Sequence, residues 1–339
     1  MPSLVQTILR NATRKRGEPI NILSFPTHER YQSNLSKTGQ NFYLWQGEGI
    51  KPWRGDYAEV PEGTILLNPD KGSNQIPAEV DIDLVLSQNK FGQFEIAQQI
   101  ANQLHLPLVS IEHTLPMETW GISELNQLYN MRGDVNIFIS EYSRGRWGWG
   151  EDEAFVIHHG IDSIEFSPEP NPQAERESVV LSVVNDWINR DWCCGFNLWR
   201  EITGYPETEL PLTVLGDTPG LSESAKSTEE LINTYRKSLV FLNTSLISPV
   251  PTSLLEAMSC GCAVVTTATC MIPDIIENGK NGYISNDPKE LRSFVDTLLA
   301  DKELALEMGK NARQTIIDKF SLISFVSNWN QIFQGVLNE

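Results

Sequence analysis

Short apolar runs rich in β-branched and aromatic residues alternate along this chain with longer segments of helical periodicity. Between two early runs, residues 92–104 carry apolar side chains at three- and four-residue steps, which is typical of a helix. This alternation predicts parallel β-α-β units with helices on both faces of a sheet. In the first half, strands are predicted at 21–25, 41–44, 84–87, 108–112, 135–139 and 154–157.

The second half repeats this scheme after the stretch 167–177, which is rich in Pro, Asn and Glu and poor in apolar residues. We therefore predict an N-terminal Rossmann-like domain (1–166), a C-terminal Rossmann-like domain (167–320) and a C-terminal helix (321–339) that packs back on the N-terminal domain. Two such domains would face each other across a central cleft. Strands are predicted at 178–184, 212–215, 239–243, 263–267 and 282–284, and helices at 195–202, 227–237, 253–258, 272–277, 288–300, 302–320 and 323–337.

Composition narrows the classes of partner. The formal net charge of −18 disfavours nucleic acid, and no apolar stretch approaches the ~20 residues that span a bilayer. The five cysteines lack the C-x-x-C spacing of zinc sites and are expected to be reduced and mostly buried. We expect a cytoplasmic protein without a signal peptide. Leu4, Val5, Ile8 and Leu9 fit one face of a short helix, for which we expect either packing on the body or a peripheral membrane contact.

The segment 248–287 carries the strongest local signal. Ser253 followed by Glu256 predicts a capping box at a helix start, and Gly261 suits the position after the helix end. A second helix is predicted to begin near Pro273. Two strand-end loops would thus each lead into a helix N-terminus at one sheet edge, an arrangement that suits a diphosphate.

In order and spacing, this segment resembles the nucleotide-sugar region of family 4 glycosyltransferases, which have the GT-B fold. Residues 254–258 match the family's L-L-E-A-M, and Ile272–Pro273–Asp274 stand where it has I-P-E. The resemblance implies that Glu256 accepts hydrogen bonds from the ribose hydroxyls of the nucleotide, for which a carboxylate is suited. It also implies that N–H groups near Thr252 and Ser253 meet the distal phosphate. The co-substrate would be a UDP- or GDP-linked sugar, with no further cofactor.

The donor-sugar loop departs from the family pattern. The family has a further Glu eight positions before Glu256, which contacts the donor sugar, and this chain has Ser248 there. The two glycines of the family loop are Pro249 and Pro251, and a proline offers no backbone donor. The chain is therefore a diverged member by this resemblance, and Ser248 is the candidate contact to the donor sugar.

Two further segments resemble the family. In PLVSIEHTLP, His113 stands where the family has a strand-end His that faces the donor sugar and its phosphate. In VVNDWINRDWCCGF, Arg190 is the cation nearest the family's Lys, which offsets charge on the leaving diphosphate, and Asp186 replaces its Arg. The resemblance makes His113 and Arg190 the candidate catalytic residues. A surface salt bridge is the alternative role for Arg190.

The polar stretch after the first predicted strand is the candidate acceptor side. His28 and Arg30 would contact an acceptor sugar or phosphate, and Arg30 suits bidentate recognition. A capped helix start with solvated charges is an equal alternative. The family's Gly-Gly is absent here.

The sequence thus predicts an α/β protein of the GT-B class. The resemblance implies a retaining, metal-independent transfer of a hexose from a nucleotide sugar to a sugar or glycan acceptor. Two alternatives remain: a non-catalytic GT-B protein that binds carbohydrate or nucleotide, and a sugar-nucleotide epimerase. A nicotinamide oxidoreductase is disfavoured, because no G-x-G-x-x-G follows the first predicted strand.

Overall fold

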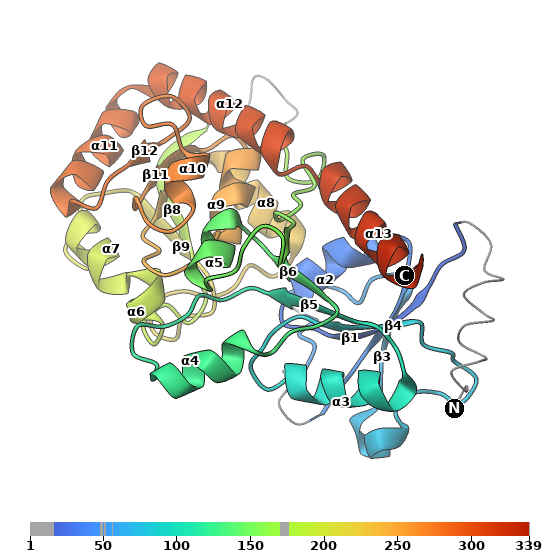
Figure 1. The fold of residues 1–339 in the computed structure, drawn as a ribbon. Helices are drawn as coiled ribbons and strands as arrows, with labels where there is room; N and C mark the ends of the chain where they lie inside the picture. The colour runs from blue at the N-terminus through green and yellow to red at the C-terminus, as the bar shows by residue number, and fades with distance from the viewer. Residues whose placement is uncertain (1–16, 48–49, 51, 56, 170–175, 339) are drawn as a thin grey trace. The chain divides into compact units, whose positions relative to one another are not determined.

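The computed structural model describes residues 17–338 except 48–49, 51, 56 and 170–175 (Figure 1). Packing groups the chain into two compact units: unit 1 comprises Met1–His158 with Ile323–Glu339, and unit 2 comprises His159–Leu322. The short helix predicted around residues 4–9, and part of the linker predicted at 167–177, lie outside the described residues. The boundary at 166 stays a prediction.

Unit 1 contains a seven-stranded parallel sheet with the order β3-β2-β1-β4-β5-β6-β7. The chain adds strands in one direction from β1 to β3 and then crosses to β4, so the order reverses between β1 and β4. The strands are β1 (Asn21–Phe25), β2 (Asn41–Leu44), β3 (Thr64–Leu66), β4 (Leu84–Ser87), β5 (Leu108–Glu112), β6 (Val135–Phe138) and β7 (Phe155–Val156).

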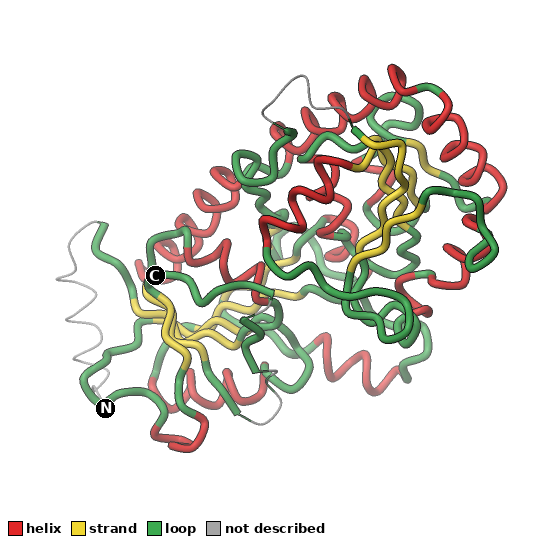
Figure 2. Tube along the Cα trace, turned by 180° about the vertical axis from the view of Figure 1, so that it is seen from behind, coloured by secondary structure: helices red, strands yellow, loops and turns green. Residues whose placement is uncertain are grey.

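Helices cover both faces of this sheet, as Figure 2 shows for the yellow strands between red helices. Strands β4 and β5 are buried along their whole length, which explains why they read as continuous apolar runs. The helices are α2 (Glu29–Ser36), the 3-10 helix η1 (Pro69–Asn74), α3 (Phe94–Leu104), α4 (Ile122–Tyr129), α5 (Glu141–Arg146) and α13 (Leu322–Asn338).

Unit 2 contains a five-stranded parallel sheet with the order β12-β11-β10-β8-β9. From β8 the chain adds β9 on one side and then β10, β11 and β12 on the other, so its order reverses between β8 and β10. The strands are β8 (Glu177–Val183), β9 (Leu212–Leu215), β10 (Ser238–Asn243), β11 (Ala263–Thr266) and β12 (Tyr283–Ile284).

The strand residues of unit 2 alternate between two helical layers. Val240 and Leu242 belong to the buried cluster that includes Trp199 of α7 and Leu291 of α11. Phe241, between them, points to the other layer, where its ring centroid lies 5.9 Å from that of Tyr235 in α8. The helices are α6 (Asp191–Cys194), α7 (Phe196–Thr203), α8 (Thr228–Lys237), α9 (Thr252–Ser259), α10 (Ile272–Ile275), α11 (Pro288–Ala300) and α12 (Lys302–Lys319).

The predicted strands and long helices are present in the structure, most with ends shifted by one or two residues. The helix predicted at 272–277 is shorter: α10 ends at Ile275 and makes a single turn. Within the described part of the chain, no helix is both long and apolar enough to cross a bilayer.

Candidate functional site

In unit 2, the loops after β8 and β10 flank the point where the strand order reverses. Open parallel sheets bind ligands at such a point, outside the carboxyl ends of the strands. The loop after β10, residues 244–251, leads into α9. The predicted donor residues Ser248, Thr252, Ser253 and Glu256 lie on this one segment.

The capping box predicted for α9 is wrong. The N-cap is Pro251, and its carbonyl accepts the first helical hydrogen bond from the N–H of Leu255 at 3.4 Å. The helix therefore starts earlier than predicted, which makes Glu256 its fifth residue and removes it from reach of the cap. Thr252 and Ser253 are the first two helical residues, half-buried, and N–H groups at such positions point out of the helix end.

Glu256 lies inside unit 2 with 4% of its surface exposed. Its Oε2 accepts a hydrogen bond from the hydroxyl of Tyr235 at 3.1 Å, and Tyr235 in α8 is fully buried. A buried carboxylate depends on such donors, because burial disfavours an unpartnered charge. The structure thus gives Glu256 a partner that the sequence did not indicate.

Two arginines hold the other end of α9. Arg313 of α12 donates to the carbonyl of Ser259 at 2.6 Å, and Arg176 donates to the carbonyl of Cys260. The helix then ends in the left-handed conformation at Gly261 (φ 80°), as predicted. Cations stabilise the negative end of a helix, so these contacts fix α9 from the end opposite to Thr252.

Arg190 lies on the neighbouring loop, after β8. It is exposed, precedes α6, and donates through Nη1 to the carbonyl of Asn185 at 3.2 Å. Asp186, which replaces the family's Arg, accepts a hydrogen bond from Asn189 at 2.7 Å and so stabilises the same turn. The two loops are joined, because the carbonyl of Cys193 accepts from the N–H of Leu246 at 2.8 Å.

In unit 1, the structure brings two predicted residues together. His113 follows β5 and is buried, and its ring lies 5.6 Å from that of His28 and 4.5 Å from that of Tyr31. His28 is exposed at the N-cap of α2 and its side chain makes no capping hydrogen bond. Arg30 lies half-buried in the first turn of the same helix.

A buried contact between Glu112 and the backbone of Lys90 lies next to His113 and was not predicted from the sequence. The carboxylate of Glu112 accepts from the N–H and hydroxyl of Thr114, both at 2.7 Å, and from the N–H of Lys90 at 3.2 Å. Burial raises the pKa of Glu112, against the opposing effect of these contacts. Burial likewise lowers the pKa of Lys90 to about 8. The residues on both sides of His113 are therefore fixed in place.

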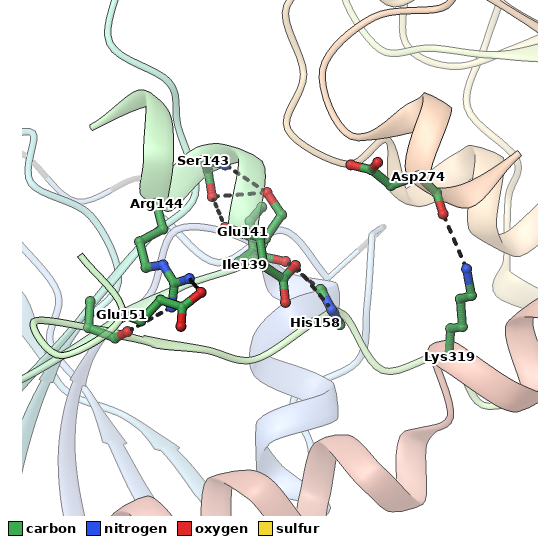
Figure 3. Close-up of polar contacts among 10 residues, drawn as sticks. Ile139, Glu141, Ser143, Arg144, Glu151, His158, Asp274 and Lys319 are labelled. Atoms are coloured by element: carbon green, nitrogen blue, oxygen red, sulfur yellow. Dashed lines mark hydrogen bonds and ion pairs between the residues drawn. The ribbon is translucent and has the colours of Figure 1, made fainter. Parts of the chain in front are cut away.

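His158, which follows β7, has a structural role. Figure 3 shows His158 beside Ile139 and Glu141: its Nδ1 lies 3.2 Å from the carbonyl of Ile139 and its Nε2 lies 3.4 Å from the carboxylate of Glu141. In unit 2, Lys319 donates to the carbonyl of Asp274 at 3.2 Å. Over the described ranges, no group of three or more His, Cys, Asp or Glu side chains is arranged to hold a metal ion.

Known proteins resemble this chain in sequence and in fold. Residues 224–315 match the model of the family described as glycosyl transferases group 1. Alpha-maltose-1-phosphate synthase of Mycolicibacterium smegmatis is 26% identical over 345 residues, which cover 81% of this chain and 88% of that protein.

Two solved structures have the same fold at 15% identity. One is Anabaena HepE in complex with UDP, with a TM-score of 0.71, and the alignment covers 94% of this chain and 100% of that chain. The other is sucrose-phosphate synthase from Thermosynechococcus elongatus, with a TM-score of 0.72 and coverage of 94% and 99%. These likenesses confirm the predicted α/β GT-B class.

Proposed function

We propose that this chain, whose residues 224–315 match the model of the glycosyl transferases group 1 family, is a glycosyltransferase that moves a hexose from a nucleotide sugar to a sugar or glycan acceptor. One observation carries the proposal. The candidate donor residues from Ser248 to Glu256 lie on one segment at the carboxyl edge of β10, beside the reversal of strand order in unit 2.

The start of α9 supplies the phosphate site in this proposal. Pro249 and Pro251 have no N–H, so backbone donors must come from the residues that follow them. Thr252 and Ser253 occupy the first two positions of an eight-residue helix, where N–H groups and the helix dipole favour an anion. Glu256, held by Tyr235, then accepts from the ribose hydroxyls.

The donor nucleotide is UDP in this proposal. HepE, which has the same fold, has been solved in complex with UDP and with UDP-glucose. The hydroxyl of Ser248 replaces a carboxylate at the donor-sugar position, so it supplies one weaker hydrogen bond to a sugar hydroxyl. We therefore expect a higher KM for the donor sugar than for a chain with Glu at this position.

The chemistry we propose is retaining and independent of metal. The bond between the anomeric carbon and the diphosphate breaks, and negative charge develops on the leaving oxygen. Arg190 and the α9 terminus offset that charge, which is the role a metal ion has in other transferases. His113 donates a hydrogen bond to the transferred sugar, and His28 and Arg30 contact the acceptor.

The test is release of UDP from UDP-glucose and other UDP-sugars, with and without candidate acceptor sugars. We expect release to continue in excess EDTA, and NMR of the product to show the donor's anomeric configuration.

His113→Ala should lower turnover by about 100-fold or more. His105→Asn, at an exposed left-handed position at the end of α3, is the matched control and should leave turnover unchanged. A folded protein that binds UDP but releases none from any donor would reject the proposal.

A further inference from the structure

Cys193 and Cys194 form an adjacent thiol pair at the end of α6, on the loop after β8. Their sulfur atoms lie 3.5 Å apart, and both thiols are free. The side chains belong to the buried cluster of unit 2, with residue exposures of 4% and 7%. The two adjacent sulfurs therefore lie beside Arg190, whose side chain is exposed.

The backbone carbonyls of the two cysteines hold the loop after β10. The carbonyl of Cys193 accepts from the N–H groups of Leu246 (2.8 Å) and Ile247 (3.1 Å). The carbonyl of Cys194 accepts from the hydroxyl of Thr244 at 3.1 Å and from the indole N–H of Trp187 at 2.9 Å. Three of these four donors belong to residues 244–247, which run directly into Ser248.

The residue after the pair packs directly against the loop 244–247. Gly195 follows Cys194 in the left-handed conformation, and a Cβ there would lie 2.1 Å from the carbonyl oxygen of Thr244. A displacement of the cysteine turn must therefore displace the loop 244–247 as well. The loop leads to the start of α9, so the positions of Thr252 and Ser253 depend on this turn.

Oxidation of the pair would change the geometry of that turn. A disulfide between adjacent cysteines closes an eight-membered ring that includes their own peptide bond, and its S–S distance is ~2.05 Å. The sulfurs would have to approach from 3.5 Å, so the peptide between them must reorient. The carbonyl of Cys193, which belongs to this peptide, would then turn away from the N–H groups of Leu246 and Ile247, and the adjoining carbonyl of Cys194 would shift relative to the Thr244 hydroxyl. Disulfides constrained in this way belong to the labile, regulatory class.

We propose that Cys193 and Cys194 are a reversible oxidation site, at which a peroxide forms a disulfide between them and thereby releases the loop 244–247. The consequence for ligand binding rests on the proposed function: the oxidised protein binds UDP more weakly, because the start of α9 loses its support.

The reaction begins at Cys193. The hydrogen bond from the Cys194 thiol, followed by the charge of Arg190, lowers the pKa of Cys193, which favours the thiolate as the attacking form. It attacks one oxygen of hydrogen peroxide, the O–O bond breaks, and hydroxide leaves and takes a proton from solvent, giving a sulfenic acid and water.

Cys194 then completes the disulfide. The same hydrogen bond raises its pKa, so it keeps its proton until it reacts. It loses that proton, its sulfur attacks the sulfur of Cys193, and the S–O bond breaks with release of a second water. The two thiols lose two electrons in all, and one peroxide becomes two waters. A small thiol reductant reverses the change.

The direct test is amide hydrogen exchange of residues 244–247, measured by mass spectrometry before and after peroxide treatment. We expect the peptide with both cysteines to become lighter by two hydrogens, and the amides of Leu246 and Ile247 to lose protection until a reductant is added. Cys193→Ser and Cys194→Ser should each keep this protection after peroxide. Unchanged protection in a wild type that has formed the disulfide would overturn the proposal, as would thiols that remain fully alkylatable after treatment.

A second measurement is UDP affinity by calorimetry, which we expect to fall by about tenfold on oxidation. Cys270→Ser, at the half-buried cysteine outside the pair, should respond as the wild type does. If Cys270→Ser abolishes the response, the chemistry belongs to Cys270 and the proposal is wrong. If the reduced protein binds no UDP, the proposed function fails, whereas the exchange measurement still decides whether the pair releases the loop.

Discussion

Two glycines at the ends of α7 provide a matched test of how the cysteine turn packs. Gly195 precedes the helix with φ 65° and Gly204 follows it with φ 77°, so an alanine would be strained at both positions. A Cβ at Gly195 would lie 2.1 Å from the carbonyl oxygen of Thr244. At Gly204 the nearest atom would lie 3.9 Å away, on Thr208, which is an ordinary contact.

The two substitutions therefore share one destabilising effect and differ in another. The left-handed conformation costs an alanine about 1–2 kcal/mol at either position. Only Gly195→Ala adds an overpacking cost, of about 1–3 kcal/mol, because a backbone carbonyl has to move. We expect the free energy of unfolding to fall by about 1–2 kcal/mol in Gly204→Ala and by about 2–5 kcal/mol in Gly195→Ala.

The assay is urea unfolding followed by circular dichroism and tryptophan fluorescence, since Trp199 of α7 and its neighbour Trp187 are fully buried. The difference between the two variants isolates the contact with Thr244. An equal loss of unfolding free energy in both variants would contradict this prediction, because it would mean that the carbonyl of Thr244 moves without an energetic cost. Gly195→Ala should also weaken UDP binding, whereas Gly204→Ala should not.

Three further predictions concern buried polar groups. Tyr235→Phe removes the hydroxyl that donates to Glu256, and should lower the free energy of unfolding by about 1.5–3 kcal/mol in urea titrations; an unchanged value would mean that the bond contributes nothing. The pKa of Lys90 falls from 10.5 to about 8 on folding. Burial of the charged ammonium therefore lowers the free energy of unfolding by its full amount below pH 8, and by less and less as the pH rises to 10.5. Between pH 8 and 10.5, the free energy of unfolding of the wild type should rise by about 3 kcal/mol relative to that of Lys90→Met. Parallel plots of unfolding free energy against pH for the two proteins would contradict this. Thr114→Val removes one donor to Glu112 beside His113, so kcat should fall while KM for the donor changes little; rescue by Thr114→Ser would separate this from a packing effect.

Most strands of the two sheets could be predicted because each leaves a recognisable run of residues in the sequence. Strands buried on both faces need continuous apolar runs, and β4, β5 and β10 have them. The short edge strand β3 (Thr64–Leu66) carries no such signal, because it is half-buried to exposed, and it was missed. The helices α4 and α5 were also missed, since most of α4 faces solvent and α5 has only six residues.

The detailed site depended on contacts between distant residues. The capping box at Ser253 and Glu256 satisfied every local rule, but Pro251 occupies the N-cap and its carbonyl starts the helix. Glu256 is instead held by Tyr235, 21 positions earlier. The contact of the Lys90 N–H with Glu112 likewise joins the loop after β4 to the end of β5, which no periodicity could indicate.

A thermal-shift titration with UDP, GDP and ADP is the most direct test of the proposed UDP site at the start of α9, because a ligand of the folded state raises the melting temperature by mass action. We predict a rise with UDP that Glu256→Ala abolishes and that Glu307→Ala, at an exposed position on α12, retains. A folded wild type whose melting temperature responds to none of the three nucleotides, or a Glu256→Ala variant that responds to UDP as the wild type does, would contradict the claim.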